Sequence, residues 1–455
     1  ECPISFFDAY RIYVIVAACI AALLIIAIVV VILIALRERE NEKKRQDALW
    51  KIHFHKLRKP VHKSRSQSFT SAVSGVSGRS GDMSEILDWR TETDKLCYFY
   101  HGAEPLTAFK HTIVLRFDEV TNAEFRKMRQ IEHDNLNRFV GVAVDTGLIY
   151  SLWKFCPRGT LQEVITKGSL PMDTVFIRSM MMDIASGLHF IHESAMHVHG
   201  RLTSQVLPVH SCMVDDRWQV KISYYGMTCI KEYERRTEEA CYQRGSYLEQ
   251  LWTAPEILRG EVDDIGTQPG DVYSFAIIAS ELVTKKTAWD LDNRKENADD
   301  IIRKVTKPSM DPFRPALEIH ESIEIIPSLI NLIRECWSEW PRHRPEMKKV
   351  KSLLSSMQTG KKLNLMDHVM NTLENYASSL EAEVEERMKE LVEEKKKSDV
   401  LLYRMLPRCS KSKISCLIAQ SRQNCNTCVH FGSKTSSEAF PLGGSSRIYY
   451  NLLLA

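Results

Sequence analysis

The stretch of sequence that decides the fold is Trp252-Thr-Ala-Pro-Glu256. Two further motifs follow it along the chain, Asp271-Val-Tyr-Ser-Phe275 and then Arg344-Pro345. One short motif is a weak signal, whereas three motifs in a fixed order at this spacing are a specific one. All three lie within residues 88–357, which have the composition of a globular domain.

The apolar pattern changes along this domain. Short apolar runs such as 112–116 and 148–153 come first, and helical patterns such as 180–192 and 272–282 follow. Strands followed by helices predict an α+β domain with a small β-rich lobe and a larger helical lobe.

Residues 12–36 form a run without a charged side chain. As a helix this run reaches about 37 Å, enough to cross a hydrocarbon core of about 30 Å. Residues 37–65 are rich in Lys and Arg, whereas residues 1–11 carry few charges. The positive-inside rule therefore predicts a single-pass type I membrane protein, with 1–11 outside the cell and the rest cytoplasmic. The basic flank also predicts contact with anionic membrane lipid.

Residues 37–87 are interpreted as a basic, Ser-rich juxtamembrane linker. Within it, residues 62–81 are rich in Ser and Gly and show no apolar period, which is typical of a flexible tether. Hydroxyl groups lie here among basic residues, so a cluster of phosphoacceptors is the more specific interpretation, to which the family resemblance described below adds a regulatory role. The candidates are Ser64, Ser66, Ser68, Thr70 and Ser71.

Residues 361–408 carry apolar side chains at alternating spacings of three and four, with Glu and Lys on the other faces. This period predicts a parallel dimeric coiled coil, and a single amphipathic helix lying on the domain is the alternative. The expected seam includes Leu373, Leu380, Val384, Leu391 and Leu401.

Composition excludes two classes of protein. The 61 Lys and Arg residues nearly balance the 58 Asp and Glu residues, giving a net charge of +3, so a nucleic-acid partner is not expected. Twelve cysteines in 455 residues are too dilute for a disulfide scaffold.

The three opening motifs resemble the large lobe of protein kinases, in which Ala254-Pro255-Glu256 is the Ala-Pro-Glu segment. The resemblance implies a two-lobed kinase-like domain in which Glu256 pairs with Arg344. It also makes Asp271 part of the same structural motif.

The positions that carry kinase chemistry have changed. The catalytic loop reads His199-Gly200-Arg201, so Arg201 stands where the base should be, and Tyr224 stands where an Asp should hold Mg²⁺. Between residues 88 and 116 only Gly102 is available for a Gly-rich loop. The domain is therefore predicted to be a pseudokinase without catalytic residues or a metal site.

A degenerate nucleotide pocket is still expected between the lobes. Its candidates are Arg116 at the place of the strand lysine, Glu124 as the helix carboxylate and Trp153 at the back, with Lys154 and Cys156 beside it.

The chain as a whole resembles the membrane receptor guanylyl cyclases. The residues that carry this likeness include Phe155-Cys-Pro-Arg-Gly-Thr-Leu161, Leu251-Trp-Thr-Ala-Pro-Glu256, Glu374-Asn-Tyr-Ala377 and Leu401-Leu-Tyr-Arg-Met-Leu-Pro407. The resemblance implies a kinase homology domain that binds ATP without transferring phosphate. It also implies a dimerisation helix that forms homodimers, or heterodimers with related cyclases.

The same family makes cGMP from GTP in a domain that needs Mg²⁺ or Mn²⁺ held by carboxylates. In residues 409–455 Glu438 is the only acidic residue, so we expect that domain to be missing from this chain and the tail to be unstructured or aberrant. Residues 206–210 look like a loop insertion. The leading hypothesis is the membrane-proximal regulatory part of such a cyclase. The alternatives are a truncated, non-enzymatic isoform that pairs with intact cyclases, and an active receptor kinase.

Overall fold

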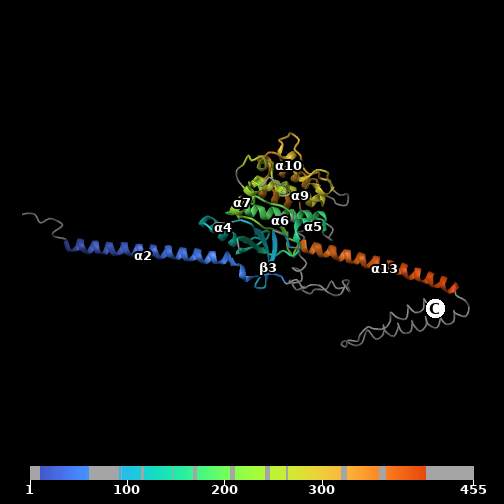
Figure 1. Cartoon of the computed structure of the whole chain (residues 1–455), viewed down its shortest axis with the longest axis horizontal. Helices are drawn as coiled ribbons and strands as arrows, with labels where there is room; N and C mark the ends of the chain where they lie inside the picture. The colour runs from blue at the N-terminus through green and yellow to red at the C-terminus, as the bar shows by residue number, and fades with distance from the viewer. Residues whose placement is uncertain are drawn as a thin grey trace, which may run out of the picture. The chain divides into compact units, whose positions relative to one another are not determined.

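A computed structural model describes residues 11–60, 92–93, 95–113, 117–145, 147–167, 172–204, 211–240, 246–262, 265–318, 325–357 and 365–405 (Figure 1). The candidate phosphoacceptors Ser64–Ser71, Arg116, the insertion at 206–210 and the tail 409–455 lie outside these residues. The chain divides into two compact units, residues 1–370 and residues 371–455.

The first element is α2 (Arg11–Trp50), a helix of 40 residues. Its apolar part is exposed, and it is the one helix of the described residues that is long and apolar enough to cross a membrane. The helix does not end at residue 36 but continues through the segment interpreted as linker. That segment is rich in Glu, Lys, Arg and Gln, which are good helix formers, and Lys44 pairs with Glu40 one turn away at 3.2 Å.

The small lobe is built on a six-stranded sheet with the order β1-β5-β6-β4-β3-β2. The strands are β1 (Lys51–His53), β2 (Leu57–Arg58), β3 (Leu96–His101), β4 (Glu104–His111), β5 (Phe139–Asp145) and β6 (Leu148–Lys154). Helix α4 (Glu119–Gln130) packs against β5. The mixed six-stranded sheet confirms the β-rich small lobe.

Two sequence interpretations of this lobe are wrong. Residues 51–58 are not linker: β1 pairs in parallel with β5, and β2 pairs with β3, so this short segment supplies both edges of the sheet. Its side chains Ile52, Phe54 and Leu57 pack with an apolar cluster on one face of the sheet, which fixes it there. The strand expected at 112–116 is not present at residues 112–113, because β4 ends at His111; residues 114–116 lie outside the described residues.

The large lobe is mainly helical. Its helices are α5 (Leu161–Lys167), α6 (Thr174–Glu193), α7 (Thr228–Ala240), α8 (Pro255–Leu258), α9 (Gln268–Thr284), α10 (Ala298–Thr306), α11 (Pro327–Cys336) and α12 (Met347–Ser356). Short 3₁₀ helices lie at η1 (Phe54–Lys56) in the small lobe and at η2 (Ser246–Trp252), η3 (Ala288–Asn293) and η4 (Pro341–His343) here. A small sheet joins β7 (Gly159–Thr160), β8 (Cys212–Val214) and β9 (Val220–Ile222). Helix α9 is buried from Gly270 to Val283 and forms the centre of the lobe.

The expected pair of Glu256 and Arg344 is present. Arg344 donates from both terminal nitrogens to the two Glu256 oxygens, at 2.6 Å and 2.8 Å, and both side chains are buried. A bidentate pair of this geometry joins the start of α8 to the segment before α12.

The long C-terminal helix is α13 (Leu365–Met405). Within residues 371–405 its large apolar side chains are exposed, including Leu373, Leu380, Val384, Leu391 and Leu401. These exposed apolar side chains form a stripe that a partner can cover.

We expect Trp50→Ala to lower the free energy of unfolding of the domain by about 3–5 kcal/mol, because this indole is fully buried against Phe125. Trp340→Ala is the matched control. That side chain is 65% exposed, so its loss should change stability by no more than about 0.5 kcal/mol. Urea unfolding of the full chain in nanodiscs, followed by circular dichroism, compares the two. Equal midpoints would show that residues 50–58 are not part of the domain.

Candidate functional site

The candidate site lies where the small and large lobes meet. Strand β4 supplies His111, the loop before β8 supplies Arg201, the loop after β9 supplies Tyr224 and helix α7 supplies Glu234. Tyr224 is fully buried and has a left-handed backbone with φ of 63°. Two residues later Gly226, also left-handed, lies so close to α4 that an added Cβ would be 2.8 Å from the Met128 sulfur. The chain turns tightly here, and the turn aims Tyr224 into the site.

The carboxylate of Glu234 is the centre of a buried polar cluster. It accepts hydrogen bonds from Arg201 Nη1 at 3.0 Å and from the Tyr224 hydroxyl at 2.8 Å. His111 Nδ1 lies 2.9 Å from its other oxygen, and His111 Nε2 lies 2.9 Å from the Ser151 hydroxyl. Burial alone would raise the pKa of Glu234, but the bonds and charges of His111 and Arg201 outweigh it and lower this pKa to about 2. Glu234 is therefore an anion at neutral pH.

Helix α7 also places a basic side chain, Lys231, in this region. Lys231 is fully buried, and its ammonium donates to the His199 carbonyl oxygen at 2.6 Å. It also lies 5.1 Å from the centre of the Tyr224 ring, within the range of a cation–π contact. Burial lowers the pKa of Lys231 to about 7. Helix α7 thus places both a carboxylate and an amine between the lobes.

Asp271 fixes the loop that carries Arg201. Its carboxylate accepts from the backbone nitrogens of His199 and Gly200, each at 2.8 Å, and lies 3.0 Å from His192 Nε2. Burial alone would raise the pKa of Asp271, but the bonds from His192 and His199 hold it below its ordinary value. Asp271 sits at the start of α9 and holds the loop of His199 and Gly200 by these bonds.

Glu124 lies on α4, but it does not reach into the cluster. Its carboxylate accepts from the Thr228 backbone nitrogen at 3.0 Å and from the Thr228 hydroxyl at 2.5 Å. Thr228 is the first residue of α7, where backbone N–H groups lack partners within the helix and the helix dipole favours a negative charge. Glu124 therefore holds the N-terminus of α7.

The other nucleotide-pocket candidates do not converge on one cavity. Trp153 is fully buried between Phe139 and Tyr225, with ring centres 5.2 Å and 5.0 Å away, so its indole is part of the core. Lys154 is exposed, and the Cys156 thiol is buried.

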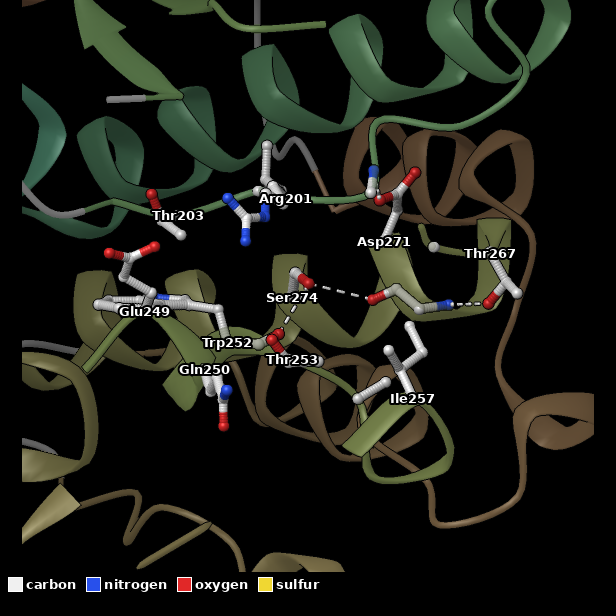
Figure 2. A pocket seen from close by; sticks show the side chains of 15 residues that line it. Arg201, Thr203, Glu249, Gln250, Trp252, Thr253, Ile257, Thr267, Asp271 and Ser274 are labelled. Atoms are coloured by element: carbon white, nitrogen blue, oxygen red, sulfur yellow. Dashed lines mark hydrogen bonds between the residues drawn. The ribbon is translucent and has the colours of Figure 1, made fainter. Parts of the chain in front are cut away.

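A small cavity adjoins the cluster on the side of α9 (Figure 2). It has a volume of about 60 Å³, which is room for a few water molecules and far below the several hundred Å³ of nucleotide-sized pockets. Figure 2 shows Arg201, Thr203 and Glu249 on one side of this cavity and Ser274 on the other.

The residues of the cleft do not fit a magnesium–nucleotide complex. Arg201 and Tyr224 replace the two carboxylates that kinases use, and Glu234 brings a negative charge to the place where phosphates would need positive ones. Among the described residues no group of three or more His, Cys, Asp and Glu side chains could hold a metal ion.

Sequence reasoning missed His111, Lys231 and Glu234. A helix at 228–240 could be read from its charged, amphipathic pattern, but the pattern gives no sign that this helix enters the cleft. His111 was missed because the apolar run taken for the strand begins at residue 112, one residue after β4 ends.

Comparisons with known proteins agree with this architecture. The family model for protein tyrosine and serine/threonine kinases matches residues 116–354. The receptor-type guanylate cyclases gcy-14 and gcy-20 of Caenorhabditis elegans are each 44% identical to this chain over 414 residues, covering 91% of this chain and 36% of theirs. Receptor-type guanylate cyclase gcy-6 of the same organism is 43% identical over 418 residues. The chain spans little more than a third of the length of these relatives.

We expect Glu234→Gln to destabilise the domain by about 1–3 kcal/mol at pH 7, because three neighbouring groups lose a charged acceptor. The folded pKa of Glu234 is about 2, below the ordinary 4.5, so its contribution is complete above pH 4.5 and is lost as the pH falls towards 2. The difference from the natural chain should therefore shrink over that interval in denaturant unfolding.

Glu232→Gln is the matched control, because Glu232 lies on the same helix with 40% of its side chain exposed. A pH-independent loss in Glu234→Gln, or an equal loss in Glu232→Gln, would contradict the role given to this carboxylate.

Proposed function

The chain belongs to the protein kinase family through its central domain, and we propose that it is the membrane-proximal regulatory part of a receptor-type guanylate cyclase in which that domain is catalytically inactive. The observation that carries the proposal is the cluster of Arg201, Tyr224 and Glu234. In it the two positions that should remove a proton and bind a metal instead donate hydrogen bonds to the protein's own carboxylate.

Phosphoryl transfer needs a base for the attacking hydroxyl and metal ions that neutralise the γ-phosphate. An Arg guanidinium is protonated at every physiological pH and cannot act as the base. Burial and the charge of Glu234 raise the pKa of Tyr224, so its phenol stays neutral and is a poor metal ligand. Both chemical requirements are therefore unmet by the same two side chains.

We place α2 across the membrane with the kinase-like domain in the cytoplasm. The apolar part of α2 is exposed, and a run of Lys and Arg follows it. The relatives are named receptor-type cyclases, which agrees with a membrane location for this chain.

The apolar stripe of α13 supports a role in pairing. Leu373, Leu380, Leu391 and Leu401 are each more than 40% exposed, which is unfavourable unless another helix covers them. We propose that a second copy or a related cyclase supplies that helix in parallel register. The paired helices would relay the state of the receptor to a domain that makes cGMP from GTP with Mg²⁺ or Mn²⁺.

The expectation that ATP acts as an allosteric ligand stays a prediction. In the conformation described here, Glu234 accepts hydrogen bonds from Arg201 and Tyr224. We propose that the domain holds this conformation through its own ion pairs and without nucleotide.

We expect the purified chain to transfer no phosphate from labelled ATP to itself or to generic peptides. The reason is the loss of the base and of the metal ligand at Arg201 and Tyr224. A heat-denatured sample sets the background, and an active protein kinase assayed in parallel sets the upper limit. Label above background that disappears in a Lys231→Met variant would establish a kinase.

We expect a chimera to make cGMP when residues 11–405 replace the matching segment of a full-length receptor-type guanylate cyclase in membranes. Leu380→Pro should lower that output at least about tenfold, because a proline inside α13 costs about 3 kcal/mol or more and disrupts pairing. Glu383→Ala, an exposed change in the same helix, is the control. Full cGMP output from a Leu380→Pro chimera that sediments as a monomer would argue against the relay.

A further inference from the structure

We infer that helix α4 is a lever that couples the cytoplasmic end of the membrane helix α2 to α7, the helix that fills the cleft. The inference builds on the proposed regulatory function and names the path by which a movement of α2 would reach the cleft. It follows from two sets of contacts on opposite sides of one short helix.

The first set joins α2 to α4. Arg126 on α4 donates to Asp47 on α2 at 2.7 Å and, with its other terminal nitrogen, to Glu119 at 2.7 Å. Its side chain is 9% exposed, so this ion pair is shielded from water and is stronger than a surface pair. Asp47 also accepts from the Trp50 indole at 3.2 Å.

Aromatic packing fixes the same junction. Trp50 ends α2, is fully buried, and its ring centre lies 4.8 Å from that of Phe125 on α4. The backbone approaches closely as well: a Cβ on Gly141 of β5 would lie 2.2 Å from the Trp50 carbonyl oxygen. The end of α2 is therefore enclosed by α4 and the sheet, so a movement of its last turn must displace α4 or break this packing.

The second set joins α4 to α7. Glu124 accepts two hydrogen bonds from Thr228, and the Thr121 hydroxyl lies 3.3 Å from the Cys229 sulfur. Glu124 and Arg126 are two positions apart, which is about 200° around a helix, so they face opposite sides of α4. A helix of 12 residues moves as a rigid element, and a tilt that follows Arg126 must therefore move Glu124.

Helix α7 connects the contact at Glu124 to the polar residues between the lobes. Thr228 begins the helix, and Lys231 and Glu234 follow one and two turns later. Both of these side chains hold the loops of Arg201, Tyr224 and His199 through buried contacts. Loosening the N-terminus of α7 at Glu124 would therefore loosen the cluster that keeps the cleft closed.

Amide hydrogen exchange on the full chain in nanodiscs tests the coupling without any activity assay. We expect Asp47→Ala to lower protection of the α7 amides about fivefold or more while α9 keeps its protection. Glu42→Ala is the matched control, because this acidic residue also lies on α2 but bonds to Arg45 and Gln46 of the same helix. It should leave α7 unchanged.

A double-mutant cycle decides whether the effect travels through α4. In the background of Glu124→Gln, where α7 has already lost its charged cap, Asp47→Ala should lower α7 protection less than about twofold. An undiminished effect in that background, or no effect in the natural chain, would overturn the inference. If Asp47→Ala also loses α9 protection, the milder Asp47→Asn change is measured in the same cycle. The phosphotransfer and chimera assays test the proposed function separately, so either proposal can fail alone.

Discussion

The buried negative charge of Glu234 is the constraint on which the arrangement of the cleft depends. A carboxylate removed from water is tolerated only when charged or polar donors surround it. Arg201, Tyr224 and His111 meet that need from three different parts of the chain. Each of them is therefore held where Glu234 requires it, and α7 is held with them. The position of the helix therefore depends on the partners of one half-buried side chain.

Much of the fold could be predicted because local patterns of apolar and charged residues indicate it. An uncharged run long enough to span a membrane and a helical period in α9 and α13 follow from short stretches of sequence. The pair of Glu256 and Arg344 was expected from the resemblance to protein kinases. The rest depends on contacts between distant segments. Residues 51–58 look like a basic linker by composition, yet they complete the sheet because Trp50 anchors them in the core. Likewise, only the pairing of β4 with β6 shows that the strand ends at His111.

In the candidate site, too, some residues could be predicted from local motifs and others could not. The degenerate positions Arg201 and Tyr224 could be identified by their place in known motifs, and the structure brings them within hydrogen-bond reach of one carboxylate. That carboxylate could not be predicted, since Glu234 is one acid among several in a charged helix. Glu124 was expected to face the cleft by its place in α4, but its carboxylate binds the start of α7. The motif gave no sign of this contact, because it depends on how α7 packs against α4.

Relative to a kinase, this cleft has a cation, Arg201, and a neutral phenol, Tyr224, where two carboxylates would stand. A kinase cleft carries carboxylates and therefore needs magnesium to hold an anionic nucleotide. Here the same region carries Arg201 and Lys231 beside the carboxylates of Glu234 and Asp271, so its charges are balanced by the protein itself. On the proposal above, the elements that hold α7 set the state of the cleft. Of these elements, α4 also contacts α2, through Arg126 and Phe125. A kinase-like domain that is inactive in this way would keep the mechanical part of a kinase, in which the position of one helix decides the state of the cleft.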